Sequence, residues 1–291
     1  MARPRIRVTY LGPPGTFSED ALRAAIGEEE IEAIPSASVY DAILAVREGT
    51  ADRALVPFEN SIEGAVTATL DTLAFDADDL SLVGEYDLPI RHCLIAREEI
   101  PLETIEVVLS HPQASAQCAR FIRENLPQAK VHAAASTAEA VRTVAESDRP
   151  WAALGTESAA GLYGAAVLRQ GVEDETDNIT RFVWIGPEGT HPAGSGPWRT
   201  SLVFSELGED HPGALVEALG AFSGREVNLT RIESRPLRRG LGRYQFFLDI
   251  EGAADDGPLA AAIEDLRSKA ETVRVLGSWP IAAPPGVPGA G

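Results

Sequence analysis

The segment from Ile6 to Ile26 reads IRVTYLGPPGTFSEDALRAAI, and its character changes twice along its length. Ile6 to Leu11 have the apolar and β-branched residues of a buried strand, which the run from Gly12 to Gly15 interrupts. Thr16 and Glu19 have the spacing of a capping box, in which the threonine accepts a backbone hydrogen bond and the glutamate reaches back. The segment therefore predicts a strand, a glycine loop and a helix in that order.

The same order of strand, polar loop and helix recurs at residues 54–73 and 107–122, and a further strand and loop are expected at 151–158. Short apolar runs that alternate with stretches of helical period are typical of an α/β architecture. Polar loops at the ends of such strands bind ligands in open α/β sheets, because backbone N–H groups and helix dipoles converge there. The alternative for each single loop is that it only caps its helix.

A stretch rich in glycine and proline, Gly186 to Pro197, has no periodicity and separates this pattern from a different one. Beyond it, the expected elements are a strand, a helix, two strands, a helix and a strand, the βαββαβ order of a ferredoxin-like domain. We therefore predict a first domain at 1–186, a linker at 187–199, a ferredoxin-like domain at 200–278 and a disordered tail at 279–291.

The 291 residues include 44 acidic and 25 basic ones, which gives a formal charge of −19. This length suggests about two domains. The excess of negative charge argues against nucleic acid and anionic membranes as partners, so an anionic ligand needs a local positive site. The start of the chain lacks the apolar stretch of a secretory signal, and no run of roughly 18 apolar residues occurs, so a cytoplasmic protein is expected.

Two cysteines and five histidines, none of them at metal-ligand spacing, argue against a disulfide framework and a metal site. Cys118 shares a helical face with Phe121 and Ile122, so it is interpreted as a core residue rather than a nucleophile. The loop from Gly12 to Gly15 lacks both the lysine of a phosphate loop and the glycine spacing of a dinucleotide site. No cofactor is therefore predicted.

The most specific polar signal is Thr180-Arg181-Phe182, inside a strand predicted at 178–185. Arg181 falls on the apolar side of that strand, and because a guanidinium is seldom buried without an anionic partner, it is expected to face a cleft. The alternative is that Thr180 is only a good strand former. Ser110 and Gln117 are seven residues apart, about two helical turns, so they are expected to line one edge of a pocket. Alternatively, Ser110 is an N-cap and Gln117 a solvated helix residue.

Together, these motifs resemble those of the prephenate dehydratase family over nearly the whole chain. Each is weak alone, but six occur in order, with a change of domain before the last two. Those two resemble the phenylalanine-binding motifs of the family's regulatory ACT domain. The matching stretches are Tyr10–Ser18, Glu59–Gly64 with Thr69–Asp71, Ser110–Gln113 with Gln117 and Cys118, Asn178–Phe182, Gly213–Val216 and Glu233–Pro236.

The resemblance implies a catalytic domain of two α/β lobes similar to type 2 periplasmic binding proteins, with the second lobe inserted at about residues 80–150 and the active site between the lobes. It also implies the reaction, in which prephenate loses carbon dioxide and its ring hydroxyl to give phenylpyruvate in phenylalanine biosynthesis. The family's essential threonine matches Thr180. Its substrate-binding positions match Thr16, Asn60, Ser61, Ser110, Gln117, Arg181 and Phe182.

Aromatisation of the ring drives this reaction, so no redox cofactor, metal or covalent intermediate is required. The enzyme must supply a hydrogen bond to the departing hydroxyl, anchors for two carboxylates and a dry surrounding for the carboxylate that leaves. We expect Thr180 to donate to the leaving oxygen. A free threonine hydroxyl is too weak an acid to give up its proton alone, so it either relays one or stabilises developing charge. Arg181 is expected to anchor a carboxylate.

The resemblance further implies inhibition by L-phenylalanine bound between paired ACT domains, which requires a homo-oligomer, either a dimer or a tetramer. On chemistry alone, a role for Gly213 in helix capping is equally well supported. Two rival functions remain: an arogenate dehydratase, whose substrate has an amino group in place of the keto group, and a non-catalytic amino-acid sensor. The residues that match the effector site are Gly213, Ala214, Leu215, Asn228, Glu233 and Ser234.

Overall fold

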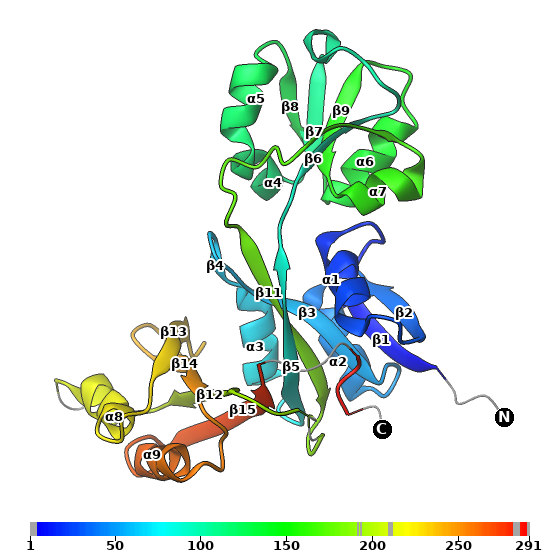
Figure 1. Cartoon of the computed structure of the whole chain (residues 1–291). Helices are drawn as coiled ribbons and strands as arrows, with labels where there is room; N and C mark the ends of the chain where they lie inside the picture. Colours follow the sequence, from blue (N-terminus) through cyan, green and yellow to red (C-terminus); the bar gives the residue numbers. More distant parts are fainter. Residues whose placement is uncertain (1–4, 191, 193, 209–211, 282–285, 290–291) are drawn as a thin grey trace.

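The computed structural model describes residues 5–190, 192, 194–208, 212–281 and 286–289, and these residues form two β-sheets. The larger sheet has ten strands, in the order β13-β14-β12-β15-β5-β11-β3-β1-β2 with β4 paired to β3. The smaller sheet has five strands, in the order β10-β6-β9-β7-β8, and Figure 1 shows it in a separate lobe at the top. The predicted α/β class is confirmed.

Lobe 1 is the part of the large sheet that begins the chain, together with its helices. β1 pairs in parallel with β2 and β3, whereas β11 runs antiparallel to β3 and β5. Along β11, Val183 and Ile185 pack on one face of the sheet, and Phe182 and Trp184 pack on the other. The elements of lobe 1 are β1 (Ile6–Leu11), α1 (Phe17–Ile26), β2 (Ile31–Ser36), α2 (Val39–Arg47), β3 (Arg53–Asn60), β4 (Gly64–Ala65), α3 (Thr67–Phe75), β5 (Leu80–Pro89) and β11 (Ile179–Pro187).

Lobe 2 contains the smaller sheet and lies between Cys93 and Gln170, later at both ends than the expected 80–150. The difference arises because Leu80–Pro89 pairs with β11 inside the large sheet, while β9 and β10 pair with β6. The elements of lobe 2 are β6 (Cys93–Ala96), the 3₁₀-helix η1 (Leu102–Thr104), β7 (Val107–Ser110), α4 (Pro112–Gln117), α5 (Ala119–Asn125), β8 (Lys130–Ala133), α6 (Thr137–Ala145), β9 (Trp151–Gly155), α7 (Glu157–Tyr163) and β10 (Ala166–Gln170).

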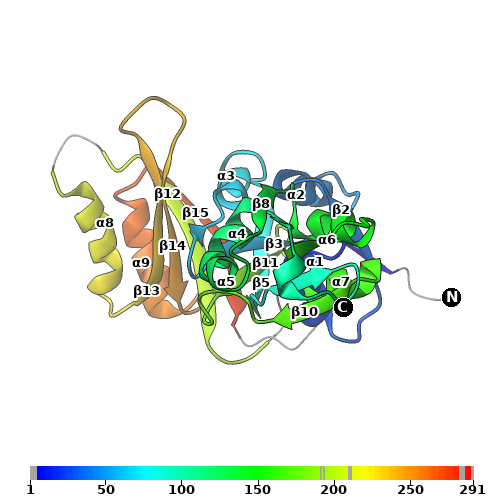
Figure 2. The same cartoon turned by 90° about the horizontal axis from the view of Figure 1, so that it is seen from above.

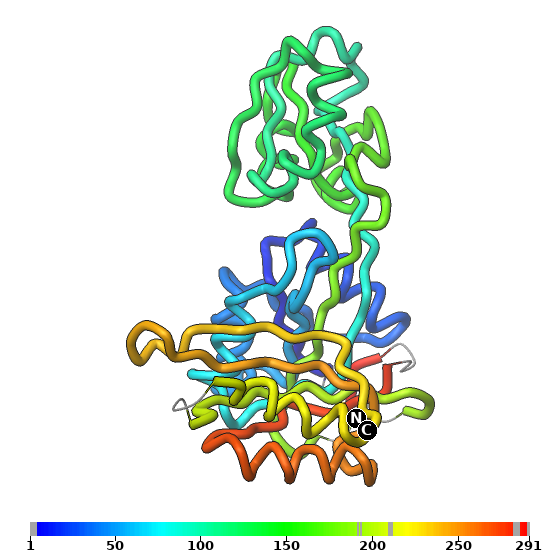
Figure 3. Tube along the Cα trace, turned by 90° about the vertical axis from the view of Figure 1, so that its left-hand side faces the viewer, coloured from blue at the N-terminus to red at the C-terminus, as the bar shows by residue number. Residues whose placement is uncertain are grey.

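Two chain segments connect the lobes, one after β5 and one before β11. They run side by side, as Figure 3 shows, and the Ile90 N–H donates to the Asn178 carbonyl at 2.8 Å. Both crossings therefore bring residues of the connecting segments close to the gap between the lobes.

The C-terminal domain follows with the predicted βαββαβ order, and this prediction is confirmed. Its helices α8 and α9 pack against one another on one face of its four strands (Figure 2). The elements are β12 (Trp198–Ser205), α8 (Ala214–Ser223), β13 (Leu229–Pro236), β14 (Tyr244–Glu251), α9 (Gly257–Arg267) and β15 (Thr272–Pro280).

The C-terminal domain is joined to lobe 1 through one continuous sheet. β15 pairs in parallel with β5 at Gly277 and Leu82, and a Cβ on Gly277 would lie 2.0 Å from the Leu82 carbonyl oxygen. Only glycine permits this approach. Phe247 and Trp279 also enter the same hydrophobic core as Leu82. The C-terminal domain is therefore packed against the lobe that contains the predicted threonine, not merely tethered to it.

The predicted capping box at the start of α1 does not form. The Thr16 hydroxyl donates to the Leu11 carbonyl at 3.2 Å, and Glu19 accepts from the Gly15 N–H at 2.7 Å instead. In a capping box, Glu19 would accept from the Thr16 N–H. Here the glycine loop places the Gly15 N–H, one residue earlier, within reach of Glu19 instead.

The tail differs from its predicted disorder. β15 extends to Pro280, the Gly286 N–H donates to the Ala25 carbonyl at 2.9 Å, and Val287 is buried against lobe 1. Arg53 also donates hydrogen bonds to the carbonyls of Pro288 and Gly289, at 2.9 and 3.2 Å, so burial of one apolar residue and several hydrogen bonds dock this part of the tail, which composition alone does not predict. Residues 282–285 and 290–291 lie outside the described part of the chain. Among the described residues, no helix is long and apolar enough to cross a membrane.

Candidate functional site

A cavity of about 600 Å³ lies between the two lobes. Lobe 1 lines it with the ends of β1, β3 and β11, and lobe 2 lines it with residues of α4, α6 and α7. Three helix N-termini meet at its wall, because the N-cap residues Thr16, His111 and Ser136 all line it. Helix N-termini attract anions, so this cavity is suited to an anionic ligand.

Thr180 and Asn60 lie side by side at the floor of the cavity. They are directly opposite one another on β11 and β3, and the Asn60 Nδ2 donates to the Thr180 Oγ1 at 2.9 Å. Their exposed fractions are only 9% and 7%, yet both line the cavity. The threonine hydroxyl is therefore largely shielded from solvent and still reachable by a bound ligand.

The orientation of the Asn60 amide determines the direction of the Thr180 hydroxyl. The Asn60 Oδ1 accepts from the backbone N–H groups of Ile62 and Glu63, both at 3.0 Å, so this atom must be the oxygen. The other amide atom is then the nitrogen, and Thr180 Oγ1 must be an acceptor in their bond. The hydrogen of the Thr180 hydroxyl remains free to donate into the cavity, and the bond that its oxygen accepts strengthens it as a donor.

The same reasoning extends along a chain of polar side chains to His92. The Asn60 Nδ2 donates to the Asn178 Oδ1 at 2.7 Å, and the Asn178 Nδ2 donates to the Gln117 Oε1 at 3.0 Å. The Gln117 Oε1 also lies 3.1 Å from the His92 Nε2, which must therefore carry the hydrogen. Burial lowers the pKa of His92, which favours the neutral imidazole that this arrangement requires.

Aromatic residues form part of the apolar wall, together with aliphatic residues such as Val66 and Ile90. Phe182 is buried on the same face of β11 as Thr180, and the Phe17 ring meets the His92 ring edge-on at 5.1 Å. Of the residues predicted for the site, Thr16, Asn60, Gln117, Thr180 and Phe182 line the cavity.

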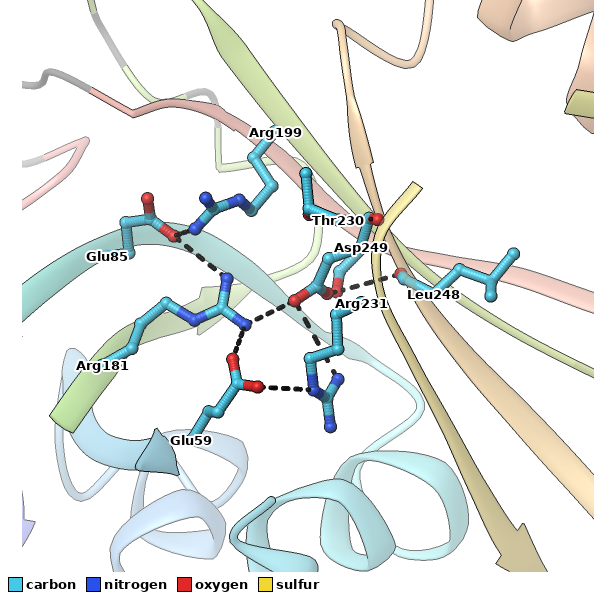
Figure 4. A network of polar contacts seen from close by, with 9 residues as sticks. Glu59, Glu85, Arg181, Arg199, Thr230, Arg231, Leu248 and Asp249 are labelled. Atoms are coloured by element: carbon cyan, nitrogen blue, oxygen red, sulfur yellow. Dashed lines mark hydrogen bonds and ion pairs between the residues drawn. The ribbon is translucent and has the colours of Figure 1, made fainter. Parts of the chain in front are cut away.

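Arg181 lies outside the cavity, which corrects the expectation that it faces the cleft and anchors a ligand. Side chains alternate along a strand, so Arg181 points to the face opposite Thr180 and Phe182. There its guanidinium contacts Glu59 at 2.7 Å, Glu85 at 3.6 Å and Asp249 (Figure 4). Burial lowers the pKa of Arg181, but the three carboxylates outweigh this effect and the net direction is upward.

Ser110 and Ser61 have structural contacts instead of facing the cavity. Ser110 is the last residue of β7, fully buried, and its hydroxyl donates to the Leu154 carbonyl at 2.9 Å. It is neither on the helix with Gln117 nor the N-cap, which is His111. The Ser61 Oγ accepts from the Ile179 N–H at 3.0 Å and holds the end of β3 against the connecting segment.

Sequence reasoning missed several residues at or beside the cavity, and three of them, Asn178, His92 and Arg142, bear directly on its chemistry. Asn178 is the first residue of the Asn178–Phe182 motif, so the sequence could have indicated that it lies near Thr180. His92 and Arg142 belong to none of the family motifs. Arg142, on α6, is the sole arginine or lysine among the described residues that line the cavity. Its guanidinium has no hydrogen-bond or ion-pair partner in the described part of the chain. It is therefore available for an anionic ligand.

The residues predicted to bind an effector do not converge within one chain. Gly213 is the N-cap of α8 with a φ of 100°, and Asn228 follows the other end of that helix. A helix of 10 residues separates its ends by about 15 Å. Ala214 and Leu215 lie with Gly213 in the first turn, while Glu233 and Ser234 lie on β13, at the edge of the large sheet.

Family models and the curated relatives identify one family. A family model described as prephenate dehydratase matches residues 8–190, and one described as an ACT domain matches 206–268. A prephenate dehydratase of Mycobacteroides abscessus is 43% identical over 280 residues, covering 94% of this chain and 90% of that protein. A crystal structure of prephenate dehydratase from Arthrobacter aurescens in complex with L-Phe has a TM-score of 0.86 at 39% identity, covering 97% of this chain and 94% of that one. A structure described as GqqA, a novel type of quorum quenching acylase, has a TM-score of 0.81 at 32% identity, covering 94% and 98%.

Proposed function

The chain belongs to the prephenate dehydratase family and is a lyase acting on prephenate, and we propose that its chemistry takes place in the cavity between the lobes, at Thr180. The observation that carries this proposal is the fixed Asn60 amide, which donates to the Thr180 oxygen and leaves the hydroxyl hydrogen free to donate to a ligand. The product is phenylpyruvate, and carbon dioxide and water are released.

The reaction breaks two bonds of the cyclohexadiene ring. The bond to the ring carboxylate breaks and its electron pair enters the ring, while the bond to the C4 hydroxyl breaks and its electron pair leaves with the oxygen. Charge therefore develops on the departing oxygen, where the Thr180 hydroxyl donates its hydrogen bond and stabilises the transition state. The proton that completes the water molecule comes from solvent, directly or through Thr180. Phe182 and Phe17 exclude water around the ring, which favours loss of the carboxylate charge.

The carboxylates of prephenate need positive partners, and Arg181 is already occupied by three carboxylates. Arg142 and the N-termini of α1, α4 and α6 are the positive groups at the cavity wall. We propose that Arg142 binds the pyruvyl carboxylate, the one that stays in the product. A guanidinium on the ring carboxylate would instead stabilise the charge that has to be lost.

We expect Arg142→Gln to raise the KM for prephenate by about 10- to 100-fold, because a hydrogen bond to a charged group contributes about 1.5–3 kcal/mol. Since the retained carboxylate is bound equally in the ground and transition states, kcat should change by less than about threefold. Steady-state kinetics measure both quantities. Arg123→Gln, an exposed arginine of the same lobe outside the cavity, is the matched control. A fall in kcat at constant KM would contradict this assignment.

Wild-type enzyme mixed with prephenate should produce phenylpyruvate, followed by its absorbance, at a higher kcat/KM than with arogenate. A higher kcat/KM for arogenate would identify the rival dehydratase, and binding without turnover of either substrate would identify a sensor. An acylase of the kind named for one structural neighbour needs an activated nucleophile. None of the described hydroxyl groups at the cavity wall is hydrogen-bonded to a histidine, which favours the dehydratase.

We further propose that L-phenylalanine inhibits this enzyme at the C-terminal domain, as its ACT family match and the L-Phe complex of the Arthrobacter aurescens relative support. Gly213 and Asn228 lie at opposite ends of α8, too far apart to contact one ligand within a single domain. One ligand can contact both only if Gly213 comes from one copy of the domain and Asn228 from a second copy. The effector site therefore calls for at least a dimer, whose mass should be measured by light scattering with and without L-phenylalanine.

A further inference from the structure

Strand β13 contacts lobe 1 through the side chains of one face. Arg231, Glu233 and Arg235 alternate with exposed residues along it. Arg235 forms a two-pronged ion pair with Asp71 of α3, at 3.1 and 2.8 Å. Two motifs that are separate in the sequence, Thr69–Asp71 and Glu233–Pro236, are thus in direct contact. The strand proposed to sense the effector is therefore fixed to the catalytic lobe.

A second contact, the interdomain cluster, is larger and lies nearer the catalytic threonine. Figure 4 shows its three arginines interleaved with three carboxylates. Arg181 contacts Asp249 of β14, Arg231 of β13 lies 3.6 Å from Glu59, and Arg199 of β12 contacts Glu85. Each domain thus binds across the interface through charged groups of both signs. The members are Glu59, Glu85, Arg181, Arg199, Arg231 and Asp249.

The interdomain cluster lies directly beneath the catalytic pair. Thr180 pairs with Asn60 across β11 and β3, and in the next register position Arg181 pairs with Glu59. The first pair faces the cavity and the second faces the C-terminal domain. Arg181 and Glu59 are the chain neighbours of Thr180 and Asn60, so a displacement of their backbone would also displace the residues that hold the hydroxyl and the amide.

Arg231 is the weakly bound member of the cluster. Its side chain is 7% exposed, and its two terminal nitrogens form no hydrogen bond with any described residue. It lies 3.9 Å from Asp249 and 4.9 Å from the centroid of the Phe58 ring, on which Arg181 also stacks at 5.2 Å. Buried donors without partners are costly. A small movement of β13 would let Arg231 bond to the Oδ2 atom of Asp249, the same oxygen that Arg181 contacts, or to the Oε1 atom of Glu59, whose Oε2 atom contacts Arg181.

We propose that Glu59 and Arg181 are positioning residues, through which β13 and β14 set the geometry of the Asn60–Thr180 pair. Arg231 and Asp249 are their partners on the C-terminal domain, and competition between Arg231 and Arg181 for the Oδ2 atom of Asp249 provides two arrangements of the cluster. An effector that moves β13 changes the balance between them. This inference rests on the proposed inhibition by L-phenylalanine, and it names the route by which that inhibition reaches Thr180.

Two variants of the full-length enzyme test the route. Asp249→Asn removes one carboxylate from Arg181 and is expected to lower kcat by about tenfold without effector, with KM changed less than twofold. Arg231→Gln removes the competing arginine. It is expected to weaken inhibition by L-phenylalanine at least tenfold, within the range of about 5- to 150-fold typical of coupling between sites. Calorimetry without prephenate should show L-phenylalanine binding within about threefold of wild type.

The controls separate positioning from a general effect on the fold. Arg225→Gln breaks a comparable ion pair, with Asp265 at 3.1 Å, inside the C-terminal domain and should leave kcat and inhibition unchanged. Arg231→Lys, which restores the charge, should recover part of the inhibition. If Asp249→Asn does not fold, Arg199→Gln, which frees Glu85 in the same cluster, replaces it.

The outcomes distinguish this inference from the proposed regulation. Wild-type enzyme that L-phenylalanine does not inhibit would refute the regulation, and the kcat of Asp249→Asn would then decide the positioning role alone. Wild-type inhibition that persists in Arg231→Gln, together with an unchanged kcat in Asp249→Asn, would overturn the inference.

Discussion

Replacing Thr180 by alanine is expected to lower kcat for prephenate by about 10²- to 10⁴-fold, the range typical of a positioned proton donor. The KM should change by less than about threefold, because the hydroxyl makes its strongest bond only when charge develops on the departing oxygen. Phenylpyruvate absorbance gives kcat, and calorimetry with prephenate gives the affinity of the variant.

The serine variant is the matched control for this experiment. Thr180→Ser keeps the hydroxyl and removes only a methyl group, so it should retain turnover within about tenfold of wild type. An alanine variant with near-normal turnover would remove Thr180 from the mechanism, as would a serine variant as slow as the alanine variant.

Asn60→Asp should lower kcat nearly as much as Thr180→Ala, although it replaces only the amide nitrogen with an oxygen. An ionised carboxylate still accepts from the Ile62 and Glu63 N–H groups, but it has no hydrogen to donate to Thr180. The Thr180 hydroxyl would then donate to the new carboxylate and turn its hydrogen away from the substrate. We expect kcat to fall by about 10²- to 10³-fold at neutral pH, with the fold retained.

The pH dependence of this variant provides an internal check. When the new carboxyl becomes protonated, it regains a donor, so the ratio of variant to wild-type kcat should rise as the pH falls. Asn125→Asp, on an exposed helix of lobe 2, introduces the same charge away from the cavity and should leave kcat unchanged. A ratio of kcat values that does not rise as the pH is lowered from 8 to 5 would contradict the donor role of Asn60.

Local patterns were sufficient to predict most of the fold. The alternation of strands and helices, the βαββαβ order and the strand that contains Thr180 all follow from hydrophobic period and from turn residues, which act over a few neighbours. The lobe boundary could not be predicted in this way. The long strand β5 belongs to the large sheet because it pairs with β11, about a hundred residues later in the chain.

Motif membership could not show on which side of a strand a residue lies. Arg181 belongs to the same motif as Thr180, and strand alternation alone would have placed it on the opposite face. Its partners Glu59, Glu85 and Asp249 come from three distant parts of the chain, so no local signal identifies them. Arg142 could not be predicted for the same reason. It lines the cavity because lobe 2 lies opposite lobe 1, and no local sequence pattern indicates that arrangement.

The most direct test of the account is a crystal structure of the Thr180→Val variant with prephenate bound, since valine keeps the shape of threonine and removes its hydroxyl. We predict that the ring lies in the cavity between the lobes, with its C4 oxygen within about 4 Å of the side chain at position 180, the reach of a hydrogen bond in the wild type. A ring bound outside this cavity, or a C4 oxygen directed away from position 180, would contradict the central role given to Thr180.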